Sequence, residues 1–187
     1  MKKSLLIVGG SGLLGTNWAL AVRDNFDVHL ALHHRLIEIR GVHTHQLNWR
    51  DTREIERLCE KIDPDIIVNS SGYTDVDGCE LNPGRSYYAN VHLAKLFAQI
   101  STERAAQYVH ISTDHLFDGS RKFVEETQSP CPLNTYAQHK YLAEQEILKS
   151  CSSALICRTG FFGWGTSYRR SFSDEILDNL KSDKPIY

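Results

Sequence analysis

The sequence predicts an α/β fold in which a doubly wound parallel sheet carries helices on both faces. Short apolar runs recur along the chain and are separated by longer stretches with helical periodicity, which is the rhythm of successive βαβ units. Strands that are buried on both faces are apolar along their whole length, as these runs are. The expected strands are Leu5–Val8, Val28–Leu32, Ile66–Val68, Tyr108–Ile111 and Leu155–Ile156.

Helix signals fall between the expected strands. Asp51 can cap a helix that Asp63-Pro64 ends before the next strand. Longer helices are expected over Gly84–Arg104 and over Tyr136–Leu148. The buried stripe of the first of these would be Ala89, Leu93, Leu96, Phe97 and Ile100. The polar, proline-containing segment Asp118–Asn134 is expected to be a surface loop, in a position that suits a substrate lid.

The composition is that of one soluble globular domain. The 187 residues are 41% hydrophobic and 24% charged, and their net charge of -2 offers no basic field to a nucleic acid or an anionic membrane. No apolar run approaches the roughly 20 residues that span a bilayer. The five cysteines are odd in number, scattered and without a C-x-x-C pair, which fits a reducing cytoplasm.

A glycine turn follows the first expected strand directly. Gly9, Gly12 and Gly15 give G-x-x-G-x-x-G, and Gly10, Gly12 and Gly15 also satisfy G-x-G-x-x-G. Glycine is needed there because the chain turns tightly, approaches a pyrophosphate with its backbone and packs the next helix closely on the strand. The pattern favours a Rossmann-type domain that binds NADP or NAD over a plain glycine-rich turn. The pyrophosphate would be held by Gly9, Ser11, Gly12, Leu13, Leu14 and Gly15.

The end of the second strand distinguishes the two nicotinamide cofactors. An acid at this place accepts a hydrogen bond from the ribose 2′-hydroxyl of NAD, whereas a base accommodates the 2′-phosphate of NADP. The chain has His33-His34-Arg35 here, with no acid, and the planar guanidinium of Arg35 can hold a phosphate. NADP is therefore preferred to NAD, with His34 and Arg35 at the cofactor. The alternative is that Arg35 is a solvated loop charge.

Tyr136 and Lys140 lie four residues apart and so share one face of an expected helix. Reduction of a carbonyl needs a proton donor on its oxygen, and a nearby lysine cation lowers the pKa of a phenol and favours donation. A further hydroxyl is expected from Ser112-Thr113-Asp114, which follow the strand Tyr108–Ile111 at the sheet edge where ligands bind. Y-x-x-x-K alone would also fit a surface pair, so its weight comes from the accompanying motifs.

Together these motifs resemble the extended short-chain dehydrogenases/reductases, and within that family most closely the dTDP-4-dehydrorhamnose reductases. The similar segments keep the family's order and spacing across nearly the whole chain. They are Gly9–Gly15, Val68–Asp77, Tyr88–Val91, Ile111–Gly119, Tyr136–Lys140 and Arg158-Thr159.

The resemblance implies reduction of the 4-keto group of a nucleotide-linked deoxysugar by NADPH or NADH. Tyr136 would donate the proton, and Lys140 would adjust the pKa of Tyr136 and bind the ribose. The Thr113 hydroxyl would orient the keto oxygen, and Asn90 would support this group. Arg158 would be a structural or site-edge residue. The sugar would meet Thr113, Asp114, Phe117 and Tyr136. The rest of the cofactor site would be Asn48, Trp49, Ser70, Ser71, Gly72, Tyr73, Asn90, Tyr136 and Lys140.

The chain departs from the family at two places. Asn48-Trp49 stand where an acid near the adenine is common, so Trp49 either stacks near the base or packs in the core. Family members also usually continue well past this length, whereas the chain stops at Lys184–Tyr187, where another strand is expected to begin. One NAD(P)-binding domain over residues 1–187 is expected, with a substrate lobe starting at about residue 160 and mostly missing.

Other functions stay open at this point. A sugar-nucleotide epimerase or dehydratase would hold NAD tightly, which His33-His34-Arg35 disfavours. A non-catalytic, NADP-binding regulatory subunit, similar to that of methionine adenosyltransferase, would serve a partner enzyme. A third possibility is that the chain is a fragment of a longer reductase. The chain could form a homodimer or bind a partner enzyme.

His43 and His45 alternate on one side of an additional short strand. Such a pair can bind a metal ion, but no third ligand with plausible spacing is evident nearby, so no metal is expected.

Overall fold

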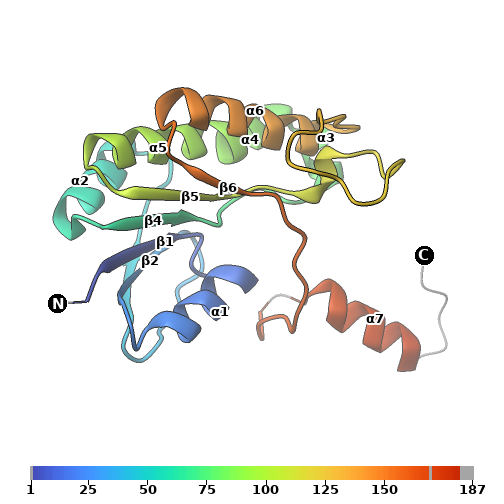
Figure 1. Ribbon diagram of the computed structural model, residues 1–187. Helices are drawn as coiled ribbons and strands as arrows, with labels where there is room; N and C mark the ends of the chain where they lie inside the picture. Colours follow the sequence, from blue (N-terminus) through green and yellow to red (C-terminus); the bar gives the residue numbers. More distant parts are fainter. Residues whose placement is uncertain (1, 169, 182–187) are drawn as a thin grey trace.

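The computed structural model describes residues 2–168 and 170–181. Among these residues six strands form one parallel sheet in the order β3-β2-β1-β4-β5-β6 (Figure 1). The strands are β1 (Ser4–Val8), β2 (Asp27–Leu32), β3 (His43–Gln46), β4 (Ile66–Asn69), β5 (Gln107–Ile111) and β6 (Leu155–Cys157). All five strands predicted from apolar runs are confirmed, with bounds that differ by one residue at one end.

The strand order reverses between β1 and β4, because β2 and β3 lie on one side of β1 and β4 to β6 on the other. In open parallel sheets a ligand crevice forms at such a reversal, outside the carboxyl ends of the strands. β1 leads into the glycine turn and β4 leads into Ser70–Tyr73 at this point. The fold therefore brings together two of the predicted cofactor-binding segments.

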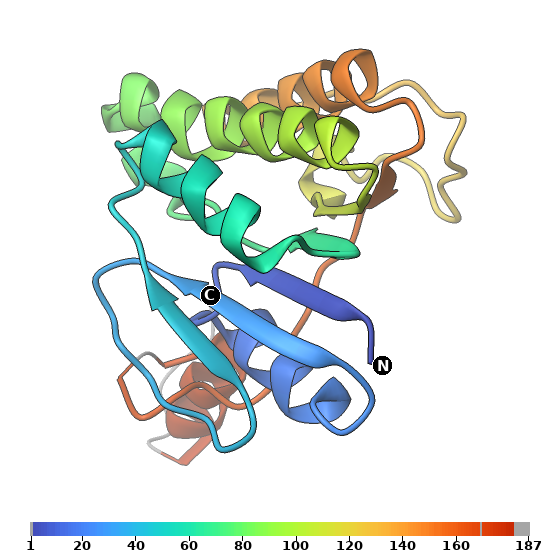
Figure 2. The ribbon, with the colours of Figure 1, turned by 90° about the vertical axis from the view of Figure 1, so that its left-hand side faces the viewer.

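Helices cover both faces of the sheet (Figures 1 and 2). One face packs against α2 (Thr52–Ile62), α5 (Leu93–Glu103) and α6 (Thr135–Ser150). The other face packs against α1 (Leu13–Val22), whose Ala19 is fully buried there. α7 (Phe172–Lys181) lies on the same side as α1 (Figure 1). None of its described residues is buried.

The predicted start and end of α2 are confirmed, and a further cap, not predicted, starts α6. The Asp51 side chain accepts hydrogen bonds from the backbone N–H groups of Arg53 and Glu54 at 3.0 and 3.3 Å, which starts α2. The helix ends at Asp63, in the left-handed conformation with φ of 47°, directly before Pro64. At α6, Asn134 accepts from the N–H of Ala137 at 2.8 Å and so fixes the start of the helix that carries the expected catalytic pair.

The single helix predicted over Gly84–Arg104 is divided in the structure. α4 (Pro83–Tyr87) passes through a π-helical turn, η1 (Tyr88–His92), into α5. A π turn inserts one residue into the helix. Ala89, within the turn, and Leu96, after it, are only partly buried, although both were expected in the core. The buried positions of α5 are Leu93, Ala94, Phe97, Ala98, Ile100 and Ser101.

The remaining elements are short or irregular. α3 (Val76–Leu81) and the 3₁₀ turn η2 (Asp114–Leu116) were not predicted. Residues 118–134 form no helix or strand, which confirms the expected surface loop. None of the described helices is both long and apolar enough to cross a membrane. The strand expected to begin at Lys184–Tyr187 lies outside the described residues.

β3 confirms the additional strand that contains His43 and His45. Its parallel register pairs His43 with His29 of β2. The expectation that no third metal-binding side chain lies near His43 was wrong, because the neighbouring strand supplies Asp27 and His29. Sequence spacing within one strand could not reveal donors that the sheet register brings from another strand.

Candidate active site

The glycine turn between β1 and α1 is tight at two positions. Gly9 has φ of +83°, and a Cβ added to it would lie 2.8 Å from the backbone of Ser71. A Cβ on Gly15 would lie 2.7 Å from the carbonyl oxygen of Gly9. These approaches explain why the turn needs glycine, because neighbouring backbone leaves no room for a side chain.

The N-terminus of α1 is open to an anion. Gly12 is its N-cap residue and no side chain caps it, and the first turn contains no acidic residue. The first N–H groups of a helix lack intrahelical partners and carry its positive dipole end, so they bind phosphate readily. The segment Gly9–Gly15 therefore has the shape and polarity that a pyrophosphate needs.

The segment after β4 is held firmly beside this turn. Ser70 Oγ donates to the carbonyl of Val8 at 2.8 Å, and Ser71 Oγ donates to Asn69 Oδ1 at 2.7 Å. The buried Asn90 accepts from the N–H of Tyr73 at 2.8 Å and donates to its carbonyl at 3.0 Å. Its amide also donates to Ser86 Oγ on α4 at 3.2 Å. Asn90 thus joins the loop to the helix that carries the π turn, and none of these hydrogen bonds goes to Thr113 or Tyr136.

Arg35 lies at the predicted adenosine side. Its guanidinium stacks 4.3 Å from the ring centroid of Tyr168, whose hydroxyl donates to the carbonyl of Ser11 at 2.7 Å. Tyr168 was missed in the sequence, since 157 residues separate it from Ser11 and no local pattern marks the contact. His34 is exposed beside Arg35, with its ring centroid 3.5 Å from that of His33.

Trp49 belongs to the core. It is 7% exposed and packs edge-on against Phe97, with ring centroids 6.0 Å apart. Its other ring neighbour is His33, at 6.3 Å. Of the two alternatives for Trp49, the structure favours core packing, while the adjoining Asn48 is exposed.

Thr113, Tyr136 and Lys140 meet at the carboxyl end of β5 and the start of α6. Thr113 is 5% exposed, caps η2 and shares a hydrogen bond with Tyr136. The buried Lys140 ammonium donates to the carbonyl of Ile111 at 2.6 Å and to Nε2 of His110 at 3.1 Å. The two hydroxyl groups are thus side by side, and the lysine is anchored to the strand behind them.

The electrostatics of this group differ from the expectation that lysine lowers the tyrosine pKa. Burial raises the pKa of Tyr136, and the hydrogen bond with Thr113 opposes that change only in part. Burial also lowers the pKa of Lys140 to about 8, against the opposing charge of Glu144. Tyr136 therefore keeps its proton at neutral pH, while most Lys140 side chains remain charged.

Glu144 lies four residues after Lys140, on the face of α6 that carries Tyr136 and Lys140. It is 3% exposed and accepts hydrogen bonds from Ser112 Oγ at 2.5 Å and from Arg158 Nη2 at 2.7 Å. Arg158 thereby joins the segment after β6 to α6, which agrees with the structural role expected for it. Glu144 was not predicted as a site residue, although its four-residue spacing from Lys140 places it on the same helix face.

A hollow of about 610 Å³ opens next to Thr113, but Thr113, Tyr136 and Lys140 are not among the residues that line it. Asp114 and Phe117, both expected to meet the sugar, line it together with Arg158. Parts of the 118–134 loop line the same hollow, so the loop predicted as a lid does lie at its wall. A second hollow, of about 340 Å³, contains none of the predicted site residues.

His110 makes the stability of this region depend on pH. It is 1% exposed, its Nδ1 has no hydrogen-bond partner among the described residues, and burial lowers its pKa well below 6.5. Below pH 6.5 His110 binds a proton in the unfolded chain but not in the native chain. The free energy of unfolding therefore falls as the pH falls. The slope from one such group approaches about 1.4 kcal/mol per pH unit.

His110→Gln, which keeps an acceptor for Lys140, is expected to show a shallower fall in unfolding free energy between about pH 6.5 and pH 4.5. Urea denaturation at several pH values measures this slope. The matched control, His92→Gln at an exposed position, should retain the wild-type slope. Equal slopes in the wild type and His110→Gln would contradict the prediction.

A family model matches the whole chain, and individual relatives match most of it. The model of the RmlD substrate binding domain family matches residues 1–187. A probable low-salt glycan biosynthesis reductase, Agl14 of Haloferax volcanii, is 31% identical over 156 residues, which are 83% of this chain and 52% of that protein. A dTDP-4-dehydrorhamnose reductase of Mycobacterium tuberculosis is 32% identical over 167 residues, covering 84% of this chain and 49% of that protein.

A crystal structure shows the same relationship. The dTDP-4-dehydrorhamnose reductase of Bacillus anthracis, in complex with NADP, has a TM-score of 0.82 and 25% sequence identity to this chain, over 97% of this chain and 61% of that one. The chain spans about half the length of the curated relatives it matches. It belongs to the RmlD substrate binding domain family, among the extended short-chain dehydrogenases/reductases and close to dTDP-4-dehydrorhamnose reductase.

Proposed function

We propose that this chain binds NADPH and forms the reductase half of an enzyme that reduces the 4-keto group of a nucleotide-linked deoxysugar. The observation that carries the proposal is the meeting of Thr113, Tyr136 and Lys140 at the carboxyl end of β5, next to Asp114, which lines an open hollow. The names of the relatives, a glycan biosynthesis reductase and a dTDP-4-dehydrorhamnose reductase, support the substrate class. The NADP complex of the Bacillus anthracis relative supports the cofactor.

The residues present fit a nicotinamide dinucleotide. The uncapped N-terminus of α1 offers N–H groups to a pyrophosphate, and Arg35 offers a cation at the end of β2. When bound, the cofactor would supply the hydride. Lys140, behind the two hydroxyl groups, would hold the ribose next to the nicotinamide.

The protein's own part in the reaction is to orient the keto oxygen and to give it a proton. The Thr113 and Tyr136 hydroxyls share a hydrogen bond, so a carbonyl oxygen that enters between them can accept from both. Tyr136 transfers its proton to the oxygen as negative charge develops there. The Lys140 ammonium stabilises the phenolate that remains, because its pKa of about 8 keeps it mostly protonated at pH 7.

The direct test supplies purified protein with NADPH or NADH and then with dTDP-4-keto-6-deoxyhexose. We expect saturable NADPH binding and substrate-dependent loss of NADPH absorbance. Cofactor binding without turnover, together with a co-purifying enzyme, would instead favour a regulatory subunit. Absence of binding to either cofactor would refute the proposal.

Arg35 is expected to select NADPH. Loss of one charge-assisted phosphate contact costs about 1.5–3 kcal/mol, so Arg35→Ala should raise the Kd for NADPH roughly 10- to 100-fold and leave the Kd for NADH nearly unchanged. Fluorescence titration with each cofactor measures both constants. Arg40→Ala, at an exposed position in the same loop, is the matched control. An undiminished preference for NADPH in Arg35→Ala would show that Arg35 is only a solvated loop charge.

A further inference from the structure

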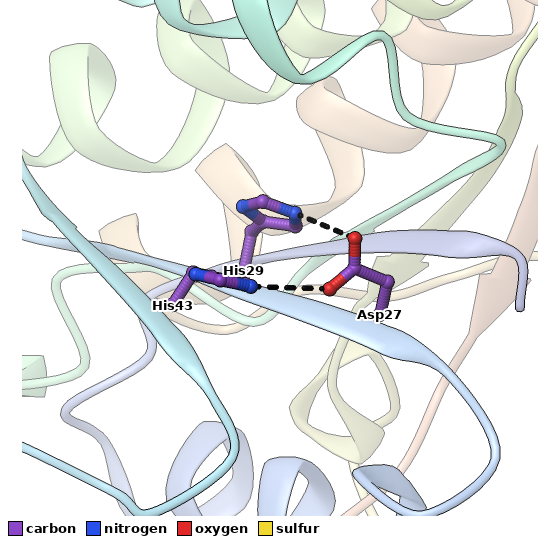
Figure 3. A group of neighbouring side chains, drawn as sticks. All are labelled: Asp27, His29 and His43. Atoms are coloured by element: carbon purple, nitrogen blue, oxygen red, sulfur yellow. Dashed lines mark ion pairs between the residues drawn. The ribbon is translucent and has the colours of Figure 1, made fainter.

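A second cluster of chemically active side chains lies on β2 and β3, toward their amino ends. Asp27 and His29 alternate along β2, His43 and His45 alternate along β3, and the register pairs His29 with His43. Side chains two residues apart on a strand share a face, so all four project from the same side of the sheet. Figure 3 shows His29 and His43 each turned toward Asp27. The candidate active site lies at the opposite, carboxyl ends of the strands.

The distances within the cluster fit a metal ion. Asp27 Oδ1 lies 3.3 Å from His43 Nε2, and Asp27 Oδ2 lies 3.5 Å from His29 Nε2 (Figure 3). One ligand atom from each of the three residues can be chosen so that all lie within 4.8 Å of one another. In a tetrahedral zinc site with bonds of 2.0–2.2 Å, neighbouring ligand atoms are about 3.4 Å apart. The two imidazole rings are stacked, with centroids 4.8 Å apart, so to bind one ion they must also rotate until both Nε2 atoms face it.

His45 supports the required form of His29. His29 Nδ1 lies 2.9 Å from His45 Nε2, on the ring edge that faces away from Asp27. A neutral histidine that donates from Nδ1 keeps an unprotonated Nε2, which is the nitrogen that faces Asp27. Histidines that bind metals usually donate their other ring N–H to a carboxylate, a backbone carbonyl or a water, and His45 Nε2 would take that place here.

We infer that Asp27, His29 and His43 bind a divalent transition metal ion, best matched by zinc, with His45 orienting His29. Two imidazoles and one carboxylate suit zinc, whereas magnesium and calcium prefer ligand sets made of oxygen. The side chain of His43 is 63% exposed and that of Asp27 is 51% exposed, so an ion can enter from solvent and a water can fill the fourth position. The ion would join the edge strand β3, only four residues long, to β2.

The test is zinc titration by calorimetry of the full 187-residue chain, purified without a histidine tag and treated with a chelator. We expect one zinc ion per chain and no magnesium binding under the same conditions. His43→Ala and Asp27→Asn should each weaken zinc binding about 100-fold or more, and His45→Ala about 10-fold. His92→Ala, which removes an exposed histidine outside the cluster, should bind zinc as the wild type does.

A second measurement separates loss of the site from loss of folding. Zinc should raise the thermal unfolding midpoint of the wild type, because it binds the native and not the unfolded chain, and should leave the midpoint of His43→Ala unchanged. Circular dichroism without zinc checks that each variant is folded. Absence of saturable zinc binding, or equal affinity in the wild type, His43→Ala and Asp27→Asn, would overturn the inference.

Discussion

Tyr136→Phe is expected to reduce turnover of a 4-keto sugar nucleotide about 10²- to 10⁴-fold while NADPH binds with its wild-type Kd. Proton transfer from a positioned acid contributes a factor of that size, and the substitution removes only the phenolic oxygen. Burial raises the pKa of Tyr136, so the wild-type side chain carries the transferable proton throughout the neutral range. Steady-state NADPH oxidation gives kcat, and fluorescence titration gives the Kd.

Tyr141→Phe is the matched control, because Tyr141 lies on the same helix and directly follows Lys140. Its kcat should stay close to that of the wild type. Substantial turnover by Tyr136→Phe would mean that another group, such as the Thr113 hydroxyl that shares its hydrogen bond, supplies the proton. Loss of NADPH binding in Tyr136→Phe would mean instead that the phenol is needed to hold the cofactor.

The sequence was informative wherever a short local pattern determines the outcome. Fully apolar runs predicted the buried strands because a parallel sheet under two helical layers exposes neither face. Asp51 predicted the start of α2 because an N-cap depends on only a few residues. The glycine spacing and the Tyr136/Lys140 pair predicted the two parts of the candidate site from equally short patterns.

Features that depend on the whole fold could not be predicted in this way. The contact of Tyr168 with Ser11 joins segments 157 residues apart. The pKa of Tyr136 is dominated by burial, which many distant residues create together, so the helical spacing to Lys140 gave the wrong direction. The cluster of Asp27, His29 and His43 arises from the register of two strands and is invisible in either strand alone.

Gly15→Ala is expected to disrupt the cofactor turn. The added Cβ would lie 2.7 Å from the carbonyl oxygen of Gly9 and 3.0 Å from the Cα of Gly10, and neither backbone atom can move without displacing the turn. Overpacking of this kind costs about 1–3 kcal/mol of unfolding free energy. A displaced turn also misaligns the N–H groups of α1, so NADPH binding should weaken about 100-fold or more, as loss of two phosphate hydrogen bonds would cause.

Gly84→Ala separates this local effect from a general intolerance of side chains at glycine. Its nearest neighbour would be Asn82 Oδ1 at 3.9 Å, and alanine is favoured over glycine in a helix by up to about 1 kcal/mol, so stability should hold or rise slightly. Urea denaturation and NADPH titration measure both consequences in each variant. If Gly15→Ala lowered stability but bound NADPH normally, the close approach at Gly15 would serve helix packing alone, and the pyrophosphate would have to be held elsewhere.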